Sequence, residues 1–391
     1  MKAIESGTPR MAENPVIALH RFGQSPWLDF IDRALTEGGA LAKMMRRWGL
    51  RGLTSNPSIF EKAIGHGAAY DDAIARLAGL GLDRDEIYES LVLEDVALAA
   101  DLFLPIYEDS SAEDGYVSLE VSPLIANDTQ ATISEARRLS ALVARPNLMI
   151  KVPATPAGLA AVSVMLAEGI SVNVTLIFGL EQYKAAVQAH LTGLEGAASA
   201  GLPLQRIASV ASFFLSRIVA MADPLLVDIV SQGGASSARA ASLQGRTAIA
   251  SAHCAYAHFL EILHSGRFQR LSALGAMPQR LLWASTGNKN PEYSETKYVE
   301  PLIGPHTVST LPTATLEAYE EQGQPALRLG VNPGRAPHEV QALREIGIDL
   351  DALTEALLDD GIAKFVSSFN ALLERIECKR RAFLSQSHVG T

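Results

Sequence analysis

The sequence predicts an α/β protein folded as a closed (β/α)₈ TIM barrel, and three observations lead to that fold class. Eight short runs rich in apolar and β-forming residues recur along the chain. Segments long enough to form helices separate them, and connections of that length pair strands in parallel. The runs are almost continuously apolar, which is typical of a sheet covered on both faces. Eight such units fit a barrel of about 250 residues plus insertions. An open doubly wound sheet remains the structural alternative.

The first half of the predicted barrel contains four strands. They are ProTrpLeuAspPheIle at 26–31, LeuArgGlyLeuThrSerAsn at 50–56, TyrValSerLeuGluVal at 116–121 and AsnLeuMetIleLysVal at 147–152. The second half contains four more. They are IleSerValAsnValThrLeuIle at 170–177, ArgIleAlaSerValAlaSerPhePhe at 206–214, ArgLeuLeuTrpAlaSerThr at 280–286 and HisThrValSerThrLeuPro at 306–312.

Two connections are longer than a simple barrel needs. Residues 57–114 follow the second strand and residues 215–279 follow the sixth, and both are rich in helix formers. We interpret each as additional helices within one domain that spans residues 1–391. Residues 336–385 show helical periodicity and are expected to pack on the barrel, over its mouth.

Composition and charge exclude several classes of function. The chain of 391 residues carries a net charge of −10, and no run of Lys and Arg indicates a nucleic-acid or membrane-surface patch. No uncharged stretch is long enough to span a membrane, and the first sixteen residues lack the apolar core of a signal peptide. We therefore expect a cytoplasmic protein. Two cysteines and scattered histidines predict neither a disulfide framework nor a metal site.

Polar residues recur toward the ends of the predicted strands, where a barrel carries its catalytic groups. A purely apolar core would not select them, so an aqueous cavity or buried partners are implied. The residues concerned are Asp29, Asn56, Glu120, Lys151, Asn173, Thr175, Ser212 and Ser285.

Lys151 is the most informative of these residues, because Met149, Ile150, Val152 and Pro153 surround it. Apolar neighbours disfavour the ammonium form and favour the free amine, which can attack a carbonyl carbon. The structural alternative is a lysine that extends from the strand end to solvent or pairs with a carboxylate.

Two carboxylates lie among strand-forming residues, Asp29 in the first strand and Glu120 in the third. Either could serve as a general acid or base, and a salt bridge to Lys151 or an arginine is the alternative for each. Asn56 precedes Pro57 at a helix start, where an Asn either caps the helix or contacts a ligand.

The segment after the sixth strand contains Ser212 and Arg217, which predict a phosphate cradle at a helix N-terminus. A helix cap with an exposed arginine is the alternative. The loop after the seventh strand, AlaSerThrGlyAsnLysAsnPro at 284–291, supplies Ser285 and Lys289 as further candidates for substrate contacts. It lacks the GlyLysSer or GlyLysThr of a nucleotide-binding P-loop.

Six motifs in order resemble the transaldolase family. They are GlyLeuThrSerAsnProSerIlePhe (52–60), SerLeuGluVal (118–121), LeuMetIleLysValProAlaThr (148–155), SerValAsnValThrLeuIlePhe (171–178), AlaSerPhePheLeuSerArgIle (211–218) and TrpAlaSerThrGlyAsnLysAsnProGluTyrSer (283–294). The last is similar to the longer bacterial subtype. The resemblance runs from about residue 15 to the C-terminus.

The resemblance implies a (β/α)₈ barrel without metal or organic cofactor. It implies transfer of a dihydroxyacetone unit from sedoheptulose 7-phosphate to glyceraldehyde 3-phosphate, giving erythrose 4-phosphate and fructose 6-phosphate in the non-oxidative pentose phosphate pathway. It also implies roles for four catalytic residues. Lys151 matches the Schiff-base lysine, and Asp29 matches the acid/base of carbon–carbon bond cleavage. Glu120 and Thr175 match the pair that positions a water for imine formation.

The resemblance further implies substrate contacts. Asn56 and Asn173 match residues that hydrogen-bond the three-carbon unit, Ser212 and Arg217 match phosphate contacts, and Phe214 packs nearby. Shorter transaldolases carry a second phosphate-binding arginine after the seventh strand. This chain lacks that arginine. Lys289 lies in the same loop and could supply the positive charge, but a lysine binds phosphate as a point charge and not through the two parallel donors of an arginine.

Three alternatives differ in chemistry. A fructose 6-phosphate aldolase would cleave without transfer, but that branch is short and tends to carry Gln at the Glu120 position and Tyr at the Phe214 position. A catalytically inactive sugar-phosphate-binding barrel is disfavoured by the presence of Lys151, Asp29 and Glu120 together. A metal-dependent aldolase is disfavoured by the absence of clustered histidines. No partner protein and no oligomeric state is indicated.

Overall fold

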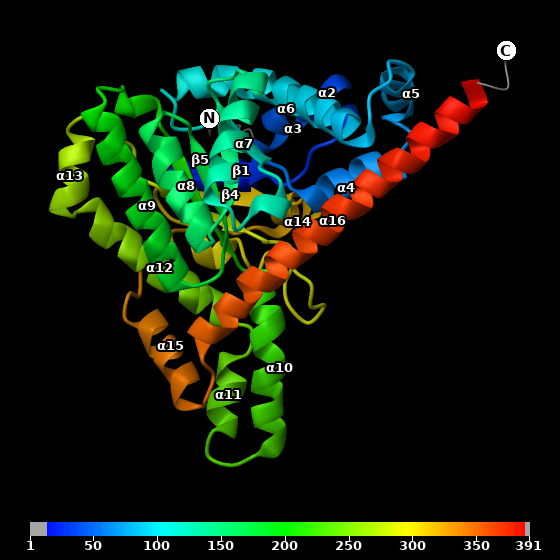
Figure 1. The fold of residues 1–391 in the computed structure, drawn as a ribbon. Helices are drawn as coiled ribbons and strands as arrows, with labels where there is room; N and C mark the ends of the chain where they lie inside the picture. The colour runs from blue at the N-terminus through cyan, green and yellow to red at the C-terminus, as the bar shows by residue number, and fades with distance from the viewer. Residues whose placement is uncertain (1–13, 388–391) are drawn as a thin grey trace, which may run out of the picture.

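The computed structural model describes residues 14–387 and contains a closed barrel of parallel strands in the order β1 to β8, which confirms the predicted fold class (Figure 1). The strands are β1 (Gln24–Leu28), β2 (Gly52–Thr54), β3 (Tyr116–Glu120), β4 (Leu148–Pro153), β5 (Val172–Ile177), β6 (Ser209–Phe214), β7 (Arg280–Ala284) and β8 (Thr307–Leu311). Each overlaps its predicted run. β1 begins earlier than predicted and ends before Asp29, so that carboxylate follows the strand.

Helices fill the connections between strands. The first half contains α1 (Pro15–Ala18), η1 (Leu19–Phe22), α2 (Arg33–Glu37), α3 (Ala40–Trp48), α4 (Pro57–His66), α5 (Asp71–Gly79), α6 (Arg84–Asp109), η2 (Pro123–Ile125) and α7 (Thr129–Val143). The second half contains α8 (Pro156–Ala167), α9 (Leu180–Ser199), η3 (Leu204–Arg206), α10 (Ser216–Gln232), α11 (Ser237–Leu243), α12 (Thr247–Leu263), α13 (Gly266–Ser272), η4 (Glu300–Leu302), α14 (Thr313–Gln322), α15 (Arg335–Glu345) and α16 (Leu350–Ser387). The additional helices predicted after β2 and β6 are α4 to α6 and α10 to α13.

Strand register determines which polar side chains lie side by side inside the barrel. Glu120 of β3 pairs with Lys151 of β4, and Lys151 pairs in turn with Asn173 of β5. Residues paired across parallel strands point to the same side of the sheet. Three polar residues from separate parts of the chain therefore form one row inside the barrel.

The long helix α16 crosses the end of the barrel where the strands terminate. It packs against α4, α5, α6 and α10, and Figure 1 shows it running diagonally across the molecule past α4. Gly361 marks a close approach, because a Cβ atom there would lie 3.1 Å from Leu176 Cδ2 and 3.5 Å from Arg217 Nη1. The C-terminal part of the chain thus covers the barrel mouth, and a side chain larger than alanine at position 361 would push it away.

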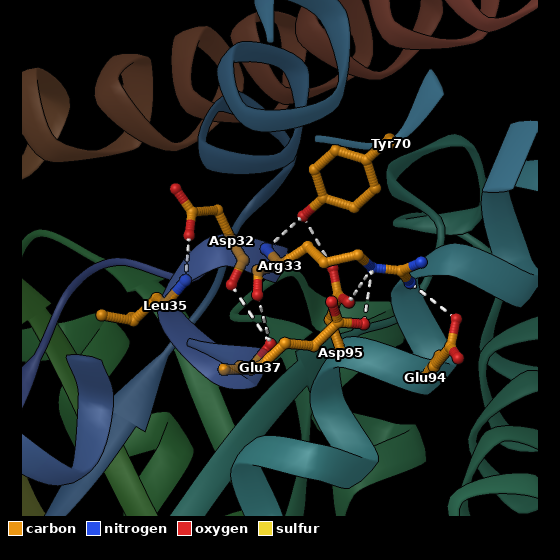
Figure 2. A network of polar contacts seen from close by, with 8 residues as sticks. Asp32, Arg33, Leu35, Glu37, Tyr70, Glu94 and Asp95 are labelled. Carbon is orange, nitrogen blue, oxygen red and sulfur yellow. Dashed lines mark hydrogen bonds and ion pairs between the residues drawn. The ribbon is translucent and has the colours of Figure 1, made fainter. Parts of the chain in front are cut away.

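A buried polar network fixes the segment that follows β1 (Figure 2). Arg33 Nε lies 3.0 Å from Asp95 Oδ1 of α6, and the Tyr70 hydroxyl donates to Asp95 Oδ2 at 2.7 Å. The backbone N–H of Arg33 donates to the same hydroxyl at 2.8 Å, and Arg33 Nη2 reaches Glu94. Asp95 is fully buried, and burial raises the pKa of its carboxyl. Because Arg33 lies four residues beyond Asp29, the network anchors the chain next to that carboxylate.

Within residues 14–387, no helix is long and apolar enough to cross a membrane. The sequence predicts no signal peptide in the first sixteen residues. Residues 1–13 of that segment lie outside the described part of the chain.

Candidate active site

A cavity of about 470 Å³ opens at the end of the barrel where the strands terminate, beneath α16. Eight of the eleven predicted site residues line it: Asp29, Asn56, Lys151, Ser212, Phe214, Arg217, Ser285 and Lys289. The other three, Glu120, Asn173 and Thr175, do not line this cavity. Glu120 and Asn173 flank Lys151 in the sheet, and Thr175 pairs with Pro153.

Lys151 extends from β4 to the floor of the cavity and is only 4% exposed. Its Nζ donates a 2.8 Å hydrogen bond to the backbone carbonyl of Ser55 and lies 3.4 Å from Glu120 Oε1. Burial raises the pKa of the Glu120 carboxyl, while the nearby positive charge of Lys151 opposes that shift. An amine and a carboxyl group therefore share a buried site where a proton can pass between them.

Asp29 faces the same cavity from the end of β1. Its Oδ1 accepts a 2.9 Å hydrogen bond from the Thr54 hydroxyl, which also lies 2.7 Å from Thr310 Oγ1. Burial raises the pKa of Asp29, and the charge of Lys151 and the Thr54 hydrogen bond oppose the rise. A carboxylate that is buried and held in one orientation is suited to accept a proton from a bound hydroxyl.

A β-bulge shapes the wall beside Thr175. The register of β5 and β6 shifts between Val174 and Ile177, and Leu176 adopts a left-handed conformation with φ 59°. Such a conformation costs about 1–3 kcal/mol in a residue other than glycine, and bulges of this kind redirect side chains near active sites. Thr175 Oγ1 is buried and has no hydrogen-bond partner within residues 14–387. That hydroxyl is available to a water or a substrate atom.

Asn173 and Ser212 form a hydrogen-bonded chain within the barrel. Asn173 Nδ2 donates to Ser118 Oγ at 3.1 Å, and Asn173 Oδ1 accepts from Ser212 Oγ at 2.6 Å. The prediction that the Ser212 hydroxyl lies at a helix N-terminus is wrong, because β6 continues to Phe214 and α10 begins only at Ser216. Ser212 instead lines the deep part of the cavity.

Asn56 combines the two roles considered for it. Its Oδ1 accepts a 3.0 Å hydrogen bond from the Ile59 N–H and so caps α4. The residue also lines the cavity. The cap fixes the direction of the side chain, and its amide nitrogen, which has no protein partner in the described part of the chain, remains available to a ligand.

Arg217 forms no ion pair within residues 14–387, and the opposing charge that acts on its pKa is that of Asp360. Its guanidinium lies 5.9 Å from the ring centres of both Phe214 and Phe365, at the N-terminal end of α10. Burial lowers the pKa of Arg217, and its buried Nη1 has no hydrogen-bond partner within residues 14–387. An unpaired donor at a helix N-terminus is the arrangement that binds phosphate.

More cationic and hydroxyl groups surround Arg217 at the mouth. Ser285 adopts a left-handed conformation with φ 54° at the end of β7, and its hydroxyl lies 2.7 Å from Ser216 Oγ. The pKa of Lys289 is lowered by partial burial and by the positive charges of Arg217, Lys364 and Lys62. Besides Lys151 and Asp29, three cations, Lys62, Arg217 and Lys289, and one carboxylate, Glu61, line the cavity, so its charged groups favour an anion.

Several cavity residues were missed by sequence reasoning. Thr54 and Thr310 are polar residues at strand ends, and the signal that identified Asp29 could have identified them. Phe365 and Ser368 come from α16, and Lys62 comes from α4. No local pattern distinguishes these three from ordinary helix residues, because only the tertiary fold brings them to the mouth.

The described residues contain no group of three or more His, Cys, Asp or Glu side chains that could hold a metal ion. Among the predicted site residues, the groups that could act on a substrate are the amine of Lys151, the carboxyl groups of Asp29 and Glu120, whose pKa values are raised, and the cations at the mouth.

Comparison with known proteins shows the family to which this sequence is similar. The sequence profile described as Transaldolase/Fructose-6-phosphate aldolase matches residues 26–376. A protein named Transaldolase from Trichodesmium erythraeum is 44% identical over 375 residues, which cover 94% of this chain and 98% of that protein. One from Thiobacillus denitrificans is 46% identical over 91% of this chain and 98% of its own length. One from Thermobifida fusca is 44% identical over 93% and 97%.

Proposed function

The chain belongs to the Transaldolase/Fructose-6-phosphate aldolase family, and we propose that it is a transaldolase that works through a Schiff base on Lys151. In this proposal it moves a dihydroxyacetone unit from sedoheptulose 7-phosphate to glyceraldehyde 3-phosphate. The products are erythrose 4-phosphate and fructose 6-phosphate, as in the non-oxidative pentose phosphate pathway. The observation that carries the proposal is the buried amine of Lys151 in a cavity that also contains Asp29, with Glu120 at 3.4 Å.

The first step is imine formation. The free amine of Lys151 attacks the C2 carbonyl of the donor and gives a carbinolamine. Glu120 then supplies a proton to the carbinolamine oxygen, which leaves as water, and the nitrogen lone pair forms the protonated imine. The raised pKa of Glu120 supports this role, because a carboxyl group must hold a proton before it can donate one. The free Thr175 hydroxyl is suited to orient the departing water.

The second step is carbon–carbon cleavage. Asp29 accepts the proton of the C4 hydroxyl, the C3–C4 bond breaks, and its electron pair moves to the imine to form an enamine. The aldose phosphate departs and a second aldose phosphate enters. The enamine attacks its aldehyde carbon, Asp29 returns the proton, and hydrolysis of the imine releases the product. Asn56 and Asn173 are proposed to hold the hydroxyls of the three-carbon unit.

The phosphate lies at the mouth in this proposal. Arg217 provides the fork of donors, with Lys289 and Ser285 beside it and Ser212 deeper in the cavity. Phe214 and Phe365 enclose the guanidinium and reduce its contact with water, which strengthens its attraction to an anion. Substrates of this kind are metabolites of the cytoplasm, where we propose that the protein acts.

A coupled assay tests the activity and separates transfer from simple cleavage. The enzyme is incubated with fructose 6-phosphate, and release of glyceraldehyde 3-phosphate is followed with and without erythrose 4-phosphate. A transaldolase releases product continuously only when the acceptor is present. Continuous release without acceptor would instead identify an aldolase, and no release in either case would refute the proposal.

A further inference from the structure

A second, smaller cavity reaches Glu120 from outside the barrel. It has a volume of about 140 Å³ and lies between α6, α7 and α16. Its walls include Tyr88 and Leu93 of α6, Ser122 after β3, and Phe369 of α16. Glu120 lines this cavity and is absent from the lining of the substrate cavity, whereas Lys151 lines the substrate cavity alone.

The Lys151–Glu120 pair therefore separates the substrate cavity from the small cavity. The contact of 3.4 Å joins an amine that lines the substrate cavity to the carboxyl group of a residue that lines the small cavity. Both carboxyl oxygens of Glu120 are buried and lack a hydrogen-bond partner in the described part of the chain. The contact with Lys151 is thus the one ion pair of this carboxyl group in the described part of the chain, and a water entering from the small cavity would supply the hydrogen bond that it lacks.

Tyr88 is a polar residue that lines the small cavity together with Glu120. Burial and the charge of Glu120, then those of Glu135 and Glu89, raise the pKa of its phenol, so it remains a neutral donor and acceptor. Its hydroxyl has no protein hydrogen-bond partner within residues 14–387. The ring of Phe369 meets the Tyr88 ring edge-on, with centroids 5.2 Å apart, and fixes its orientation.

We propose that this small cavity is a rear passage for water and protons to Glu120, with Tyr88 as the positioning residue that aligns the water. The inference rests on the proposed role of Glu120 in imine formation. That step releases one water from the carbinolamine and consumes one proton from Glu120, and imine hydrolysis takes up one water and returns the proton. When a sugar phosphate fills the mouth of the substrate cavity, water and protons reach the Lys151–Glu120 pair through the small cavity. Its volume is sufficient for several waters, because one needs about 10–15 Å³ of such space.

Oxygen exchange isolates the step that uses this passage. Each cycle of imine formation and hydrolysis replaces the C2 oxygen of fructose 6-phosphate with an oxygen from solvent. In water enriched in oxygen-18, mass spectrometry of the recovered fructose 6-phosphate reports imine turnover without any acceptor. The rate without enzyme is subtracted.

Two substitutions obstruct the passage in different ways. Leu93→Trp fills the cavity from α6, and Tyr88→Phe removes the hydroxyl and keeps the ring. We expect Leu93→Trp to slow oxygen exchange about tenfold or more and Tyr88→Phe to slow it severalfold, both with an unchanged KM for fructose 6-phosphate. The controls are Leu102→Trp on the same helix outside the cavity, and Tyr183→Phe, which removes a buried hydroxyl that has no partner within residues 14–387. Both should exchange at the wild-type rate.

The outcomes separate this inference from the proposed function. Wild-type exchange in Tyr88→Phe and in a folded Leu93→Trp would refute the passage. If Leu93→Trp does not fold, Tyr88→Phe alone decides the question. Glu120→Gln tests the underlying role, and we expect it to lose exchange by about 10²-fold or more. Unchanged exchange in Glu120→Gln would overturn the proposed chemistry of Glu120 itself.

Discussion

Replacing Arg217 with methionine should weaken binding of phosphorylated substrates while leaving the fold intact. Methionine retains an unbranched chain between the Phe214 and Phe365 rings but removes the charge and the donors. No ion pair is lost within residues 14–387, and Asp360, whose charge acts on Arg217, keeps its own ion pair with Lys364. Burial lowers the pKa of Arg217, which means that the folded protein holds this charge at a cost. The melting temperature of Arg217→Met should therefore equal or exceed that of the wild type.

The loss of affinity can be estimated from the hydrogen bonds available. A bidentate arginine–phosphate contact contains two charge-assisted hydrogen bonds of about 1.5–3 kcal/mol each. Lys289 remains at the mouth and compensates in part, so we expect a net loss of about 3 kcal/mol. Because 1.4 kcal/mol corresponds to a factor of ten, kcat/KM for fructose 6-phosphate should fall by about 10²-fold.

Unphosphorylated fructose provides the internal comparison, because its kcat/KM should change little in Arg217→Met. Arg206→Met is the matched control, since Arg206 also stacks on an aromatic ring, that of Tyr107, but lies outside the cavity. Equal losses for fructose and fructose 6-phosphate, or a melting temperature several degrees lower, would refute the proposed role of Arg217.

Other substitutions test residues that form or position the active site. Asp95→Ala should destabilise the protein by about 3–5 kcal/mol, because it leaves the buried charge of Arg33 without its main partner, and a denaturant titration measures this loss. Asp29→Asn should abolish carbon–carbon cleavage in a single-turnover assay and raise stability by about 0.5–2 kcal/mol. Because burial raises the pKa of Asp29, the wild type loses stability as the pH rises from the ordinary Asp value near 3.9 to the folded pKa. The gain from Asn should therefore grow across that window in melting curves and then level off. Gly361→Ala should be tolerated, whereas Gly361→Leu should strike Leu176, displace α16 and raise the KM for sugar phosphates.

The barrel was predictable because its signal is repeated. Each strand is a short apolar run bounded by helix-length segments. Because this pattern occurs eight times, it identifies the barrel even where the end of a single strand is misplaced by a few residues. The first strand illustrates the limit, since β1 ends before Asp29 rather than after it. Asp29 was still a valid candidate, because a carboxylate next to a buried strand is conspicuous wherever the strand ends.

Residues of the site differ in how far the sequence reveals them. Lys151 and Glu120 stand out because their neighbours are apolar, and strand register brings them together. Phe365 and Ser368 do not stand out, because a helix that covers a cavity looks like any amphipathic helix. The backbone carbonyl of Ser55, which accepts from Lys151, has no sequence signature at all. Contacts of this kind depend on the relative positions of distant segments.

The covalent intermediate gives the most direct test of the central claim. The protein is incubated with fructose 6-phosphate, reduced with borohydride, digested and examined by mass spectrometry. We predict a reduced three-carbon adduct on Lys151, in the peptide that contains β4. An unmodified Lys151, or an adduct on another lysine such as Lys289 or Lys62, would contradict the proposed mechanism.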